Sequence, residues 1–217
     1  STRLANGLAA RGVAKGHTVA TITDNHEDLV VAFFAINKVG GIWVPINTAY
    51  RGEFLRHQMA ESGASLVICE EEYLPNLLPV VDQLPAVRAI IVCGQAGQHR
   101  ARVTILSLDE VRGTDDTPPA ATVAPRDISC LIYTSGTTGP SKGCMISHGY
   151  LCSLGRQRNR SAPSQGDNWI TWSCLPLFHI AALGTVLISN LLAGERAAIS
   201  RRFSVSVFYS AARRTAV

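Results

Sequence analysis

The segment Tyr133-Thr-Ser-Gly-Thr-Thr-Gly-Pro-Ser-Lys-Gly143 separates two apolar runs, residues 130–133 and 144–146. Its glycines let successive backbone N–H groups turn into one concavity, and they let a large anion approach the main chain. Its hydroxyl side chains add donors, Lys142 adds a mobile positive charge, and none of its residues is acidic. Residues 134–142, which we call the phosphate loop, are therefore expected to bind a polyphosphate.

Two common nucleotide-binding patterns do not match the phosphate loop. A Walker loop requires G-x-x-x-x-G-K-[ST], but Ser141 is the fifth residue after Gly136, and Gly143 follows Lys142. The dinucleotide fingerprint G-x-G-x-x-G does not occur after any expected strand. The loop therefore belongs to another class of phosphate-binding segment.

A hydrolase motif overlaps the same residues. Residues 139–143 fit G-x-S-x-G, and Asp167 and His179 follow Ser141 in the chain order of a catalytic triad. That motif needs a strand directly before its serine and a helix directly after it. A polar loop precedes the serine and a strand-like apolar run, residues 144–147, follows it, so we interpret the match as accidental.

Apolar runs alternate with amphipathic segments along most of the chain. Expected strands span residues 18–23, 42–46, 65–69, 89–93, 128–133, 144–147, 169–174 and 197–200. Expected helices span residues 1–11, 24–39 (capped by Asp24 or Asn25), 53–62, 71–83, 148–160, 178–192 and 205–213. Strands that alternate with helices and are apolar almost throughout indicate a parallel sheet covered on both faces. The expected fold class is therefore α/β, with two βα lobes and largely parallel sheets.

The length of 217 residues suits one large domain or two small ones. The segment 113–127 is rich in Asp, Thr and Pro, which is typical of a linker. We therefore expect a first α/β lobe over residues 1–112 and a second α/β lobe, which carries the phosphate loop, over residues 128–217.

Composition narrows the class of protein. Apolar residues make up 47% of the chain, and the net charge of +4 comes from scattered Lys and Arg, which favours solvated faces over a nucleic-acid track. The six cysteines form no C-x-x-C pair, so we expect reduced, mostly buried thiols in a cytoplasmic protein. The apolar run 175–192 contains Pro176, His179 and Asn190, which favours a core helix over a transmembrane segment.

The phosphate loop resembles the signature T-S-G-T-T-G-x-P-K-G of the adenylate-forming enzymes, which include acyl-CoA synthetases, luciferases and peptide-synthetase adenylation domains. The one departure is that the proline stands a place early, at Pro140, with Ser141 where the family has proline. Residues 12–20 and 25–47 also look like the early region of acyl-CoA synthetases. Leu175-Pro-Leu-Phe-His179 resembles the family's P-x-F-H element, and residues 44–57 look most like the crotonobetaine/carnitine-CoA ligase-like branch.

This resemblance implies an ATP-dependent carboxylic acid–CoA ligase, which makes an acyl-adenylate and then an acyl-CoA thioester. It implies ATP, Mg²⁺ and coenzyme A as cofactors and co-substrates, and a small carboxylic acid as substrate. The family's later elements, which hold Mg²⁺ and the ribose and include a hinge and a C-terminal lysine, do not occur in residues 1–217. We therefore expect a partial N-terminal domain that is inactive by itself.

The resemblance also implies the site residues. Phosphate-binding positions are Thr134, Ser135, Gly136, Thr137, Thr138, Gly139 and Lys142. Lys142 is the expected catalytic cation, and Thr134 is also expected close to Mg²⁺. His179 is expected to contact the acyl or adenylate group, with a capping or core histidine as the alternative.

Two other functions stay open at this point. One is a peptide-synthetase-type adenylation domain, and the other is a non-catalytic nucleotide- or phosphate-binding module. In each case we expect small-molecule ligands, no nucleic acid and no transmembrane segment, and a homo-oligomer is also considered.

Overall fold

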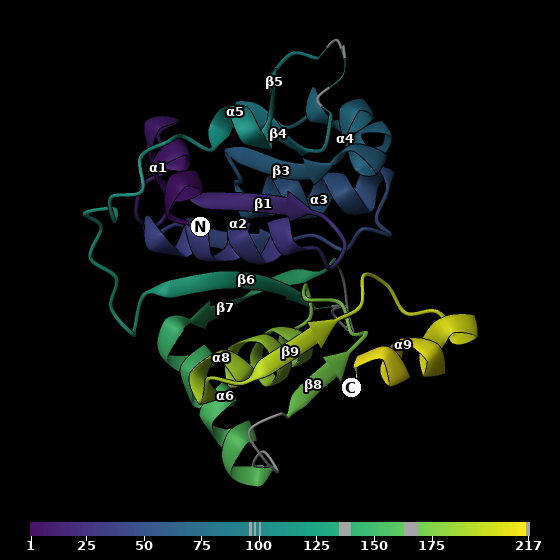
Figure 1. The fold of residues 1–217 in the computed structure, drawn as a ribbon. Helices are drawn as coiled ribbons and strands as arrows, with labels where there is room; N and C mark the ends of the chain where they lie inside the picture. Colours follow the sequence, from purple (N-terminus) through teal and green to yellow (C-terminus); the bar gives the residue numbers. More distant parts are fainter. Residues whose placement is uncertain (96, 98, 100, 135–139, 163–168, 216–217) are drawn as a thin grey trace.

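The computed structural model of the protein describes residues 1–95, 97, 99, 101–134, 140–162 and 169–215. The large sheet has seven strands in the order β5-β4-β3-β1-β2-β6-β7, and Figure 1 shows β5 and β4 toward one end of it and β6 and β7 at the other. Its strands are β1 (Thr18–Ile22), β2 (Ile42–Pro45), β3 (Leu66–Glu70), β4 (Ala89–Cys93), β5 (Thr104–Ser107), β6 (Ile128–Thr134) and β7 (Lys142–Ser147). Strands β1 to β6 are parallel, and β7 pairs antiparallel with β6. The predicted α/β class with a largely parallel sheet is confirmed.

Helices cover both faces of this sheet. They are α1 (Thr2–Ala10), α2 (Glu27–Lys38), α3 (Gly52–Ser62), the 3-10 helix η1 (Glu71–Tyr73), α4 (Leu74–Val81) and α5 (Leu108–Val111). Apolar side chains of α1, α2 and α5 belong to one buried cluster, whereas those of α3 and α4 belong to another. Neighbouring strand residues such as Leu66 and Val67 enter opposite clusters, because successive side chains of a strand point to opposite faces. Burial on both faces explains why the strands are apolar almost throughout.

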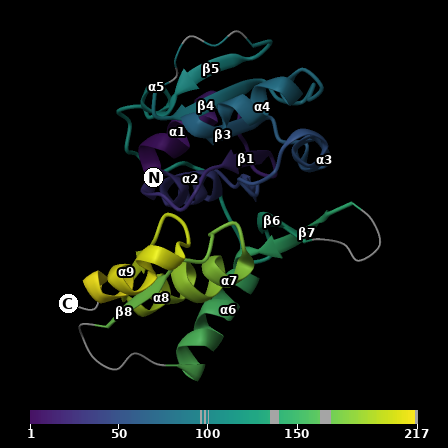
Figure 2. The same cartoon turned by 90° about the vertical axis from the view of Figure 1, so that its right-hand side faces the viewer.

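The described residues after β7 form a second group of elements. They are α6 (His148–Ser161), β8 (Ile170–Ser173), α7 (Ile180–Ala182), the π-helix η2 (Leu183–Ile188), α8 (Ser189–Ala193), β9 (Arg196–Ile199), the 3-10 helix η3 (Val205–Val207) and α9 (Phe208–Thr215). β8 and β9 pair in parallel as a separate sheet. Figures 1 and 2 show this group at the β6–β7 end of the large sheet, away from β5. Side chains of α6, α7 and η2 join the buried cluster that contains α2.

The segment 113–127 contains no helix or strand, as expected of a linker. The large sheet nevertheless continues beyond it, because β6 pairs with β2 and β7 pairs with β6. Lys15 holds the segment: its Nζ lies 2.5 Å from Asp127 Oδ2 and donates to the carbonyl of Thr122 at 3.0 Å. The division into lobes at residues 1–112 and 128–217 stays a prediction, and strands from both parts share one sheet.

The single helix expected over residues 178–192 is interrupted by the π-helix η2. The hydroxyl of Thr185 donates to the carbonyl of Ala181, and that of Ser189 donates to the carbonyl of Thr185, each at 2.6 Å. Hydroxyl bonds to the carbonyl four residues earlier compete with the helical ladder and often bend it. A π-helical turn accommodates such a local irregularity.

Strand β5 and helix α5 are not among the elements expected from the sequence. A signal for α5 was present, because Ser107 and Glu110 have the S-x-x-E spacing of a capping box. The Ser107 hydroxyl accepts from the Glu110 N–H at 3.2 Å, and the Glu110 carboxylate accepts from the Ser107 N–H at 2.6 Å. This box begins α5 directly after β5.

The six cysteines carry free thiols, of which three are buried (Cys69, Cys93 and Cys130) and one, Cys144, is exposed. No helix among the described residues is both long and apolar enough to cross a membrane. The run 175–192 is instead divided among short helices that pack on α6.

The free energy of unfolding should depend on pH through His148, the first residue of α6. Burial is the main cause that lowers the pKa of its imidazole; Lys15 lowers it further, and Asp127 opposes both. The unfolded chain therefore binds more protons at this group, so the folded state loses stability as the pH falls below the unfolded pKa of about 6.5. Between pH 7.5 and pH 5.5, roughly the range in which histidine titrates, we expect the His148→Gln variant to lose less unfolding free energy than the parent protein loses. Urea titrations at both pH values measure this, and equal losses in the two proteins would contradict it.

Candidate functional site

The carboxyl ends of the parallel strands meet at one edge of the large sheet, where open α/β sheets bind ligands. We call this the carboxyl edge. The residues that end or follow these strands are Asp24 and Asn25 after β1, Thr48 after β2, Glu70 in β3, Cys93 in β4 and Thr134 in β6. Because β7 is antiparallel, its first residue, Lys142, lies at the same edge.

Thr134 and Lys142, the two ends of the phosphate loop, are brought together by strand pairing. They are direct partners in the antiparallel register of β6 and β7, so their side chains lie on the same face. Both side chains are exposed, and the Thr134 hydroxyl lies 3.9 Å from Cys144 Sγ. The predicted donors Ser135, Gly136, Thr137, Thr138 and Gly139 lie outside the described residues. The described ends place a hydroxyl and an ammonium group together at the carboxyl edge.

Ser141 does not have the surroundings of a hydrolase nucleophile. Strand β7 follows it directly, whereas the nucleophile elbow requires a helix there. Its hydroxyl accepts a hydrogen bond from Gln58 Nε2 at 3.0 Å. Asp167, one of the two residues that follow Ser141 in triad order, lies outside the described residues. The prediction that the G-x-S-x-G match is accidental is confirmed by the strand that follows.

His179 is exposed and occupies the N-cap position directly before α7. Its side chain makes no capping hydrogen bond, and its ring centroid lies 4.9 Å from that of Phe178. The backbone N–H of Leu177 donates to Asn25 Oδ1 at 2.8 Å, which holds the Pro-x-Phe-His segment at the carboxyl edge. Within the part of the chain that the structure describes, no hydrogen bond joins His179 to Thr134 or Lys142. The structure therefore presents an exposed imidazole rather than a capping or core histidine.

Asn25 holds three segments together at this edge. Its Nδ2 donates to the carbonyls of Leu175 and Ser200, both at 2.9 Å, in addition to its bond with the Pro-x-Phe-His segment. The prediction that Asn25 or the residue before it caps α2 is wrong. His26 is the N-cap, and its Nδ1 accepts from the Asp28 N–H at 3.2 Å. Asn25 cannot serve as the cap because its amide is directed to the loops after β8 and β9.

Two arginines after β9 bind the acidic residues of the carboxyl edge. Arg201 Nη2 lies 2.6 Å from Glu70 Oε2, Arg202 Nη2 lies 2.8 Å from Glu72 Oε2, and both arginines pair with Asp24. Burial raises the pKa of Glu70, whereas the hydrogen bond from Arg202 lowers the pKa of Glu72. The three acids have carboxylate oxygens within 4.8 Å of one another, a spacing that would suit a cation. The two guanidinium groups already form ion pairs with all three acids, so we assign no metal ion to this cluster.

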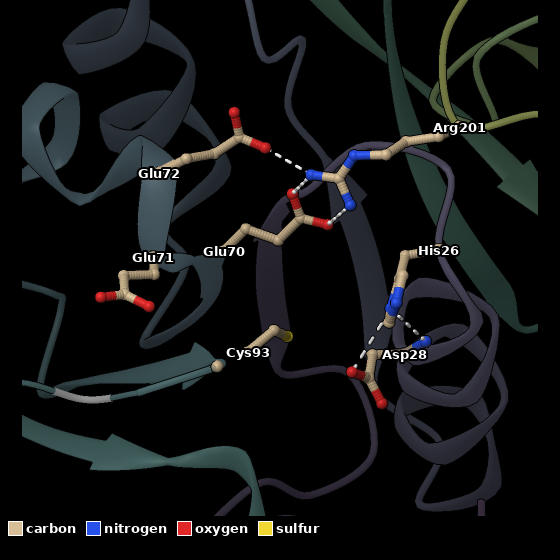
Figure 3. Close-up of a pocket in the computed structure, with 8 residues that line it drawn as sticks. His26, Asp28, Glu70, Glu71, Glu72, Cys93 and Arg201 are labelled. Atoms are coloured by element: carbon tan, nitrogen blue, oxygen red, sulfur yellow. Dashed lines mark hydrogen bonds and ion pairs between the residues drawn. The ribbon is translucent and has the colours of Figure 1, made fainter.

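A pocket of about 640 Å³ lies beside this cluster. Figure 3 shows Arg201 bound to Glu70 on one side of it and His26 with Asp28 on the other. Its lining residues are His26, Asp28, Glu70, Glu71, Glu72, Cys93, Gly94 and Arg201. Burial raises the pKa of the Cys93 thiol to about 12, so it stays protonated near neutral pH and is a poor nucleophile. Because the pocket is mainly acidic and its arginine is already paired, it disfavours a phosphate chain, which the ends of the phosphate loop suit better.

Comparison with known proteins identifies the family. A family model described as AMP-binding enzyme matches residues 1–215. Feruloyl-CoA synthase of Amycolatopsis sp is 32% identical over 96% of this chain and 39% of its own length. The medium/long-chain-fatty-acid–CoA ligase FadD6 of Mycobacterium tuberculosis is 31% identical over 96% of this chain and 34% of its own length. The chain thus spans less than half the length of these relatives.

Solved structures agree with this assignment. The anthranilate CoA ligase AuaEII in complex with anthranoyl-AMP superposes with a TM-score of 0.86 and 26% identity, over 96% of this chain and 40% of that one. The N-terminal domain of FACL13 from Mycobacterium tuberculosis gives a TM-score of 0.76 and 26% identity, over 97% and 50%. With the phosphate-loop ends at the carboxyl edge of a parallel sheet, these matches lead to one conclusion: the chain belongs to the AMP-binding enzyme family of adenylate-forming enzymes, and its relatives include acyl-CoA ligases.

Proposed function

We propose that the protein containing these residues is an ATP-dependent carboxylic acid–CoA ligase. In the first half-reaction, a carboxylate oxygen of the acid attacks the α-phosphorus of ATP, and the bond to pyrophosphate breaks as the acyl-adenylate forms. In the second, the CoA sulfur attacks the activated carbonyl, and AMP leaves as the thioester forms. The observation that carries the proposal is the pairing of Thr134 with Lys142 at the carboxyl edge, in a chain whose relatives are CoA ligases.

The phosphate loop would act on the leaving pyrophosphate. Negative charge develops there during the first half-reaction, so donors fixed around the outer phosphates stabilise the transition state electrostatically. We assign this role to Thr134, Ser135, Gly136, Thr137, Thr138, Gly139 and Lys142. Lys142 contributes a full positive charge on a long exposed side chain, which suits the phosphate oxygens.

Thr134 is also the residue that we propose beside Mg²⁺. Mg²⁺ prefers oxygen ligands and usually binds through a few protein groups together with substrate phosphates. The exposed Thr134 hydroxyl at the end of β6 fits that requirement, whereas the arginine-paired acids of the carboxyl edge do not. The ion would neutralise charge on the phosphates when it is bound.

His179 is proposed to contact the acyl or adenylate group. Its support is its exposure and the hydrogen bond from Leu177 to Asn25, which keeps the preceding residues at the carboxyl edge. Coenzyme A is the proposed second substrate. A cytoplasmic location and a homo-oligomeric state stay predictions.

The identity of the carboxylic acid substrate is a separate and more specific proposal. Residues 44–57 favour a substrate like those of the crotonobetaine/carnitine-CoA ligase-like branch. The similar proteins are named for other acids, among them feruloyl, 4-coumarate and medium- or long-chain fatty acids. Carnitine-like, hydroxycinnamic and fatty acids are therefore the three classes to compare.

Exchange of labelled pyrophosphate into ATP, followed by thioester analysis, tests the proposal. With the product of the full reading frame, we expect exchange that depends on one of the three acid classes, and a CoA thioester when CoA is added. Acid-dependent exchange without a CoA thioester would favour a peptide-synthetase-type adenylation domain and contradict the proposal. ATP binding without any exchange would favour a non-catalytic module and would also contradict it.

We expect residues 1–217 alone to show no exchange in the same assay. The phosphate loop can hold the outer phosphates, but fixing the reacting groups commonly supplies about 7–11 kcal/mol of barrier reduction. A loop that contacts the phosphates alone provides only part of this. Clear exchange by residues 1–217 would show that they contain all the groups needed for the first half-reaction.

A further inference from the structure

Ser141, the residue directly before Lys142, is held by two neighbouring residues of α3. Gln58 Nε2 donates to Ser141 Oγ at 3.0 Å, and His57 Nε2 lies 3.0 Å from the Ser141 carbonyl, to which it can donate. Gln58 is only 2% exposed, so packing in the core fixes its amide. One helix therefore holds both the side chain and the backbone of this residue.

The strand on the other side of the phosphate loop is tied to the same helix. The hydroxyl of Tyr133 donates to the carbonyl of Gln58 at 3.3 Å and to the carboxylate of Glu61. Burial raises the pKa of Tyr133, so its hydroxyl stays protonated and can donate. Its ring also covers Gly143, where an added Cβ would come within 3.3 Å of the ring. The strands that enter and leave the phosphate loop thus share α3 as a support.

The support from α3 matters because Ser141 stands at a position where the related signature has proline. A proline ring fixes its own backbone φ angle. Serine lacks that restriction but offers a hydroxyl, which the structure places within hydrogen-bond distance of Gln58. The hydrogen bonds from α3 can therefore replace the rigidity that the ring would supply.

We propose that Gln58 and His57 are positioning residues, which orient Lys142 toward the outer phosphates by anchoring Ser141. Lys142 is exposed, and its side chain is long and flexible, so the position of its ammonium group depends on how firmly its backbone is held. The inference rests on the proposed function, in which Lys142 acts on the leaving pyrophosphate. Neither positioning residue needs to touch the substrate.

The test uses Ser141→Ala and Gln58→Met, singly and together, in the product of the full reading frame. Each single variant removes one net hydrogen bond, so we expect kcat/KM for ATP in the exchange assay to fall by about 3- to 10-fold. The double variant should be no worse than either single variant, because both changes break the same contact. Ser141→Thr keeps the hydroxyl and should retain near-normal exchange.

Ser62→Ala is the matched control for a general loss of helix stability. Ser62 is a buried residue of the same helix, and its hydroxyl donates to the Met59 carbonyl at 2.9 Å, away from the phosphate loop. It should leave kcat/KM for ATP unchanged. If Ser141→Ala behaves like Ser62→Ala while Lys142→Ala abolishes exchange, the positioning role is wrong and the proposed function stands. Additive losses in the double variant would also overturn the positioning role.

A second measurement does not depend on activity. Amide hydrogen exchange over residues 142–147 should be faster in Ser141→Ala and Gln58→Met than in the parent protein and in Ser62→Ala. Unchanged protection of this strand in both variants would overturn the anchor. A third outcome is also informative: the parent protein shows no pyrophosphate exchange, and the two variants show faster amide exchange than the parent. That outcome would refute the proposed function and leave the anchor established.

Discussion

Replacing Lys142 with alanine should lower kcat of ATP–pyrophosphate exchange by about 10²- to 10³-fold. The expected loss is large because charge develops on the departing pyrophosphate, and a pre-positioned cation is worth more in the transition state than in the ground state. Lys142 is the first residue of β7 and is exposed, so the substitution removes no core packing. The unfolding free energy should change by less than about 0.5 kcal/mol, as is usual for exposed positions.

Two variants make this result specific. Lys142→Arg keeps the charge but changes the geometry of the donors, so it should recover only part of the activity. Lys38 is another exposed lysine, in the last turn of α2, and its Nζ donates to Thr2 Oγ1 at 2.8 Å. Replacing Lys38 with alanine should leave pyrophosphate exchange unchanged. Normal exchange kinetics in Lys142→Ala would show that this side chain points away from the phosphates.

The sheet was predictable because its strands are buried on both faces. Residues 66–69 and 89–93 are apolar without interruption and buried throughout, as expected of strands that are covered on both faces. Strand β5 was missed for the same reason, since Thr104–Ser107 lies at the edge and is only partly buried. Its sequence therefore lacks the signal that identifies a central strand.

The phosphate loop was predictable because its chemistry is local. Its donors are consecutive in the sequence, and the structure brings its described ends, Thr134 and Lys142, together by simple strand pairing. The support from α3 was not predictable, because Gln58 and Ser141 are 83 positions apart. Likewise, Arg202 and Asp24 are 178 positions apart, and their pairing depends on the folding of the whole chain.

Replacing Asn25 with alanine should lower the free energy of unfolding by about 2–4 kcal/mol, since each buried polar group left unpaired costs roughly 1–3 kcal/mol. Asn25 is 7% exposed, and its amide binds the carbonyls of Leu175 and Ser200 and the N–H of Leu177. All three groups belong to the segments that follow β8 and β9. Without the hydrogen bonds of the Asn25 amide, the Pro-x-Phe-His segment loses its bond to the residue after β1. The rate of pyrophosphate exchange should therefore also fall. Urea unfolding followed by circular dichroism measures the stability change.

Two further asparagine variants separate the hydrogen bonds from other effects. Asn25→Asp keeps the size of the side chain and an acceptor for the Leu177 N–H, but it turns an oxygen toward the two carbonyls that the amide nitrogen served. It should therefore be at least as destabilising as Asn25→Ala. Asn6 is half-buried, and it donates to the carbonyls of Asp115 and Thr117 at 3.1 and 2.9 Å through hydrogen bonds that are exposed to solvent, where water can replace the amide. Asn6→Ala should cost less than about 0.5 kcal/mol. Equal losses in Asn6→Ala and Asn25→Ala, or a stable Asn25→Asp, would show that the buried amide does not hold these segments to β1.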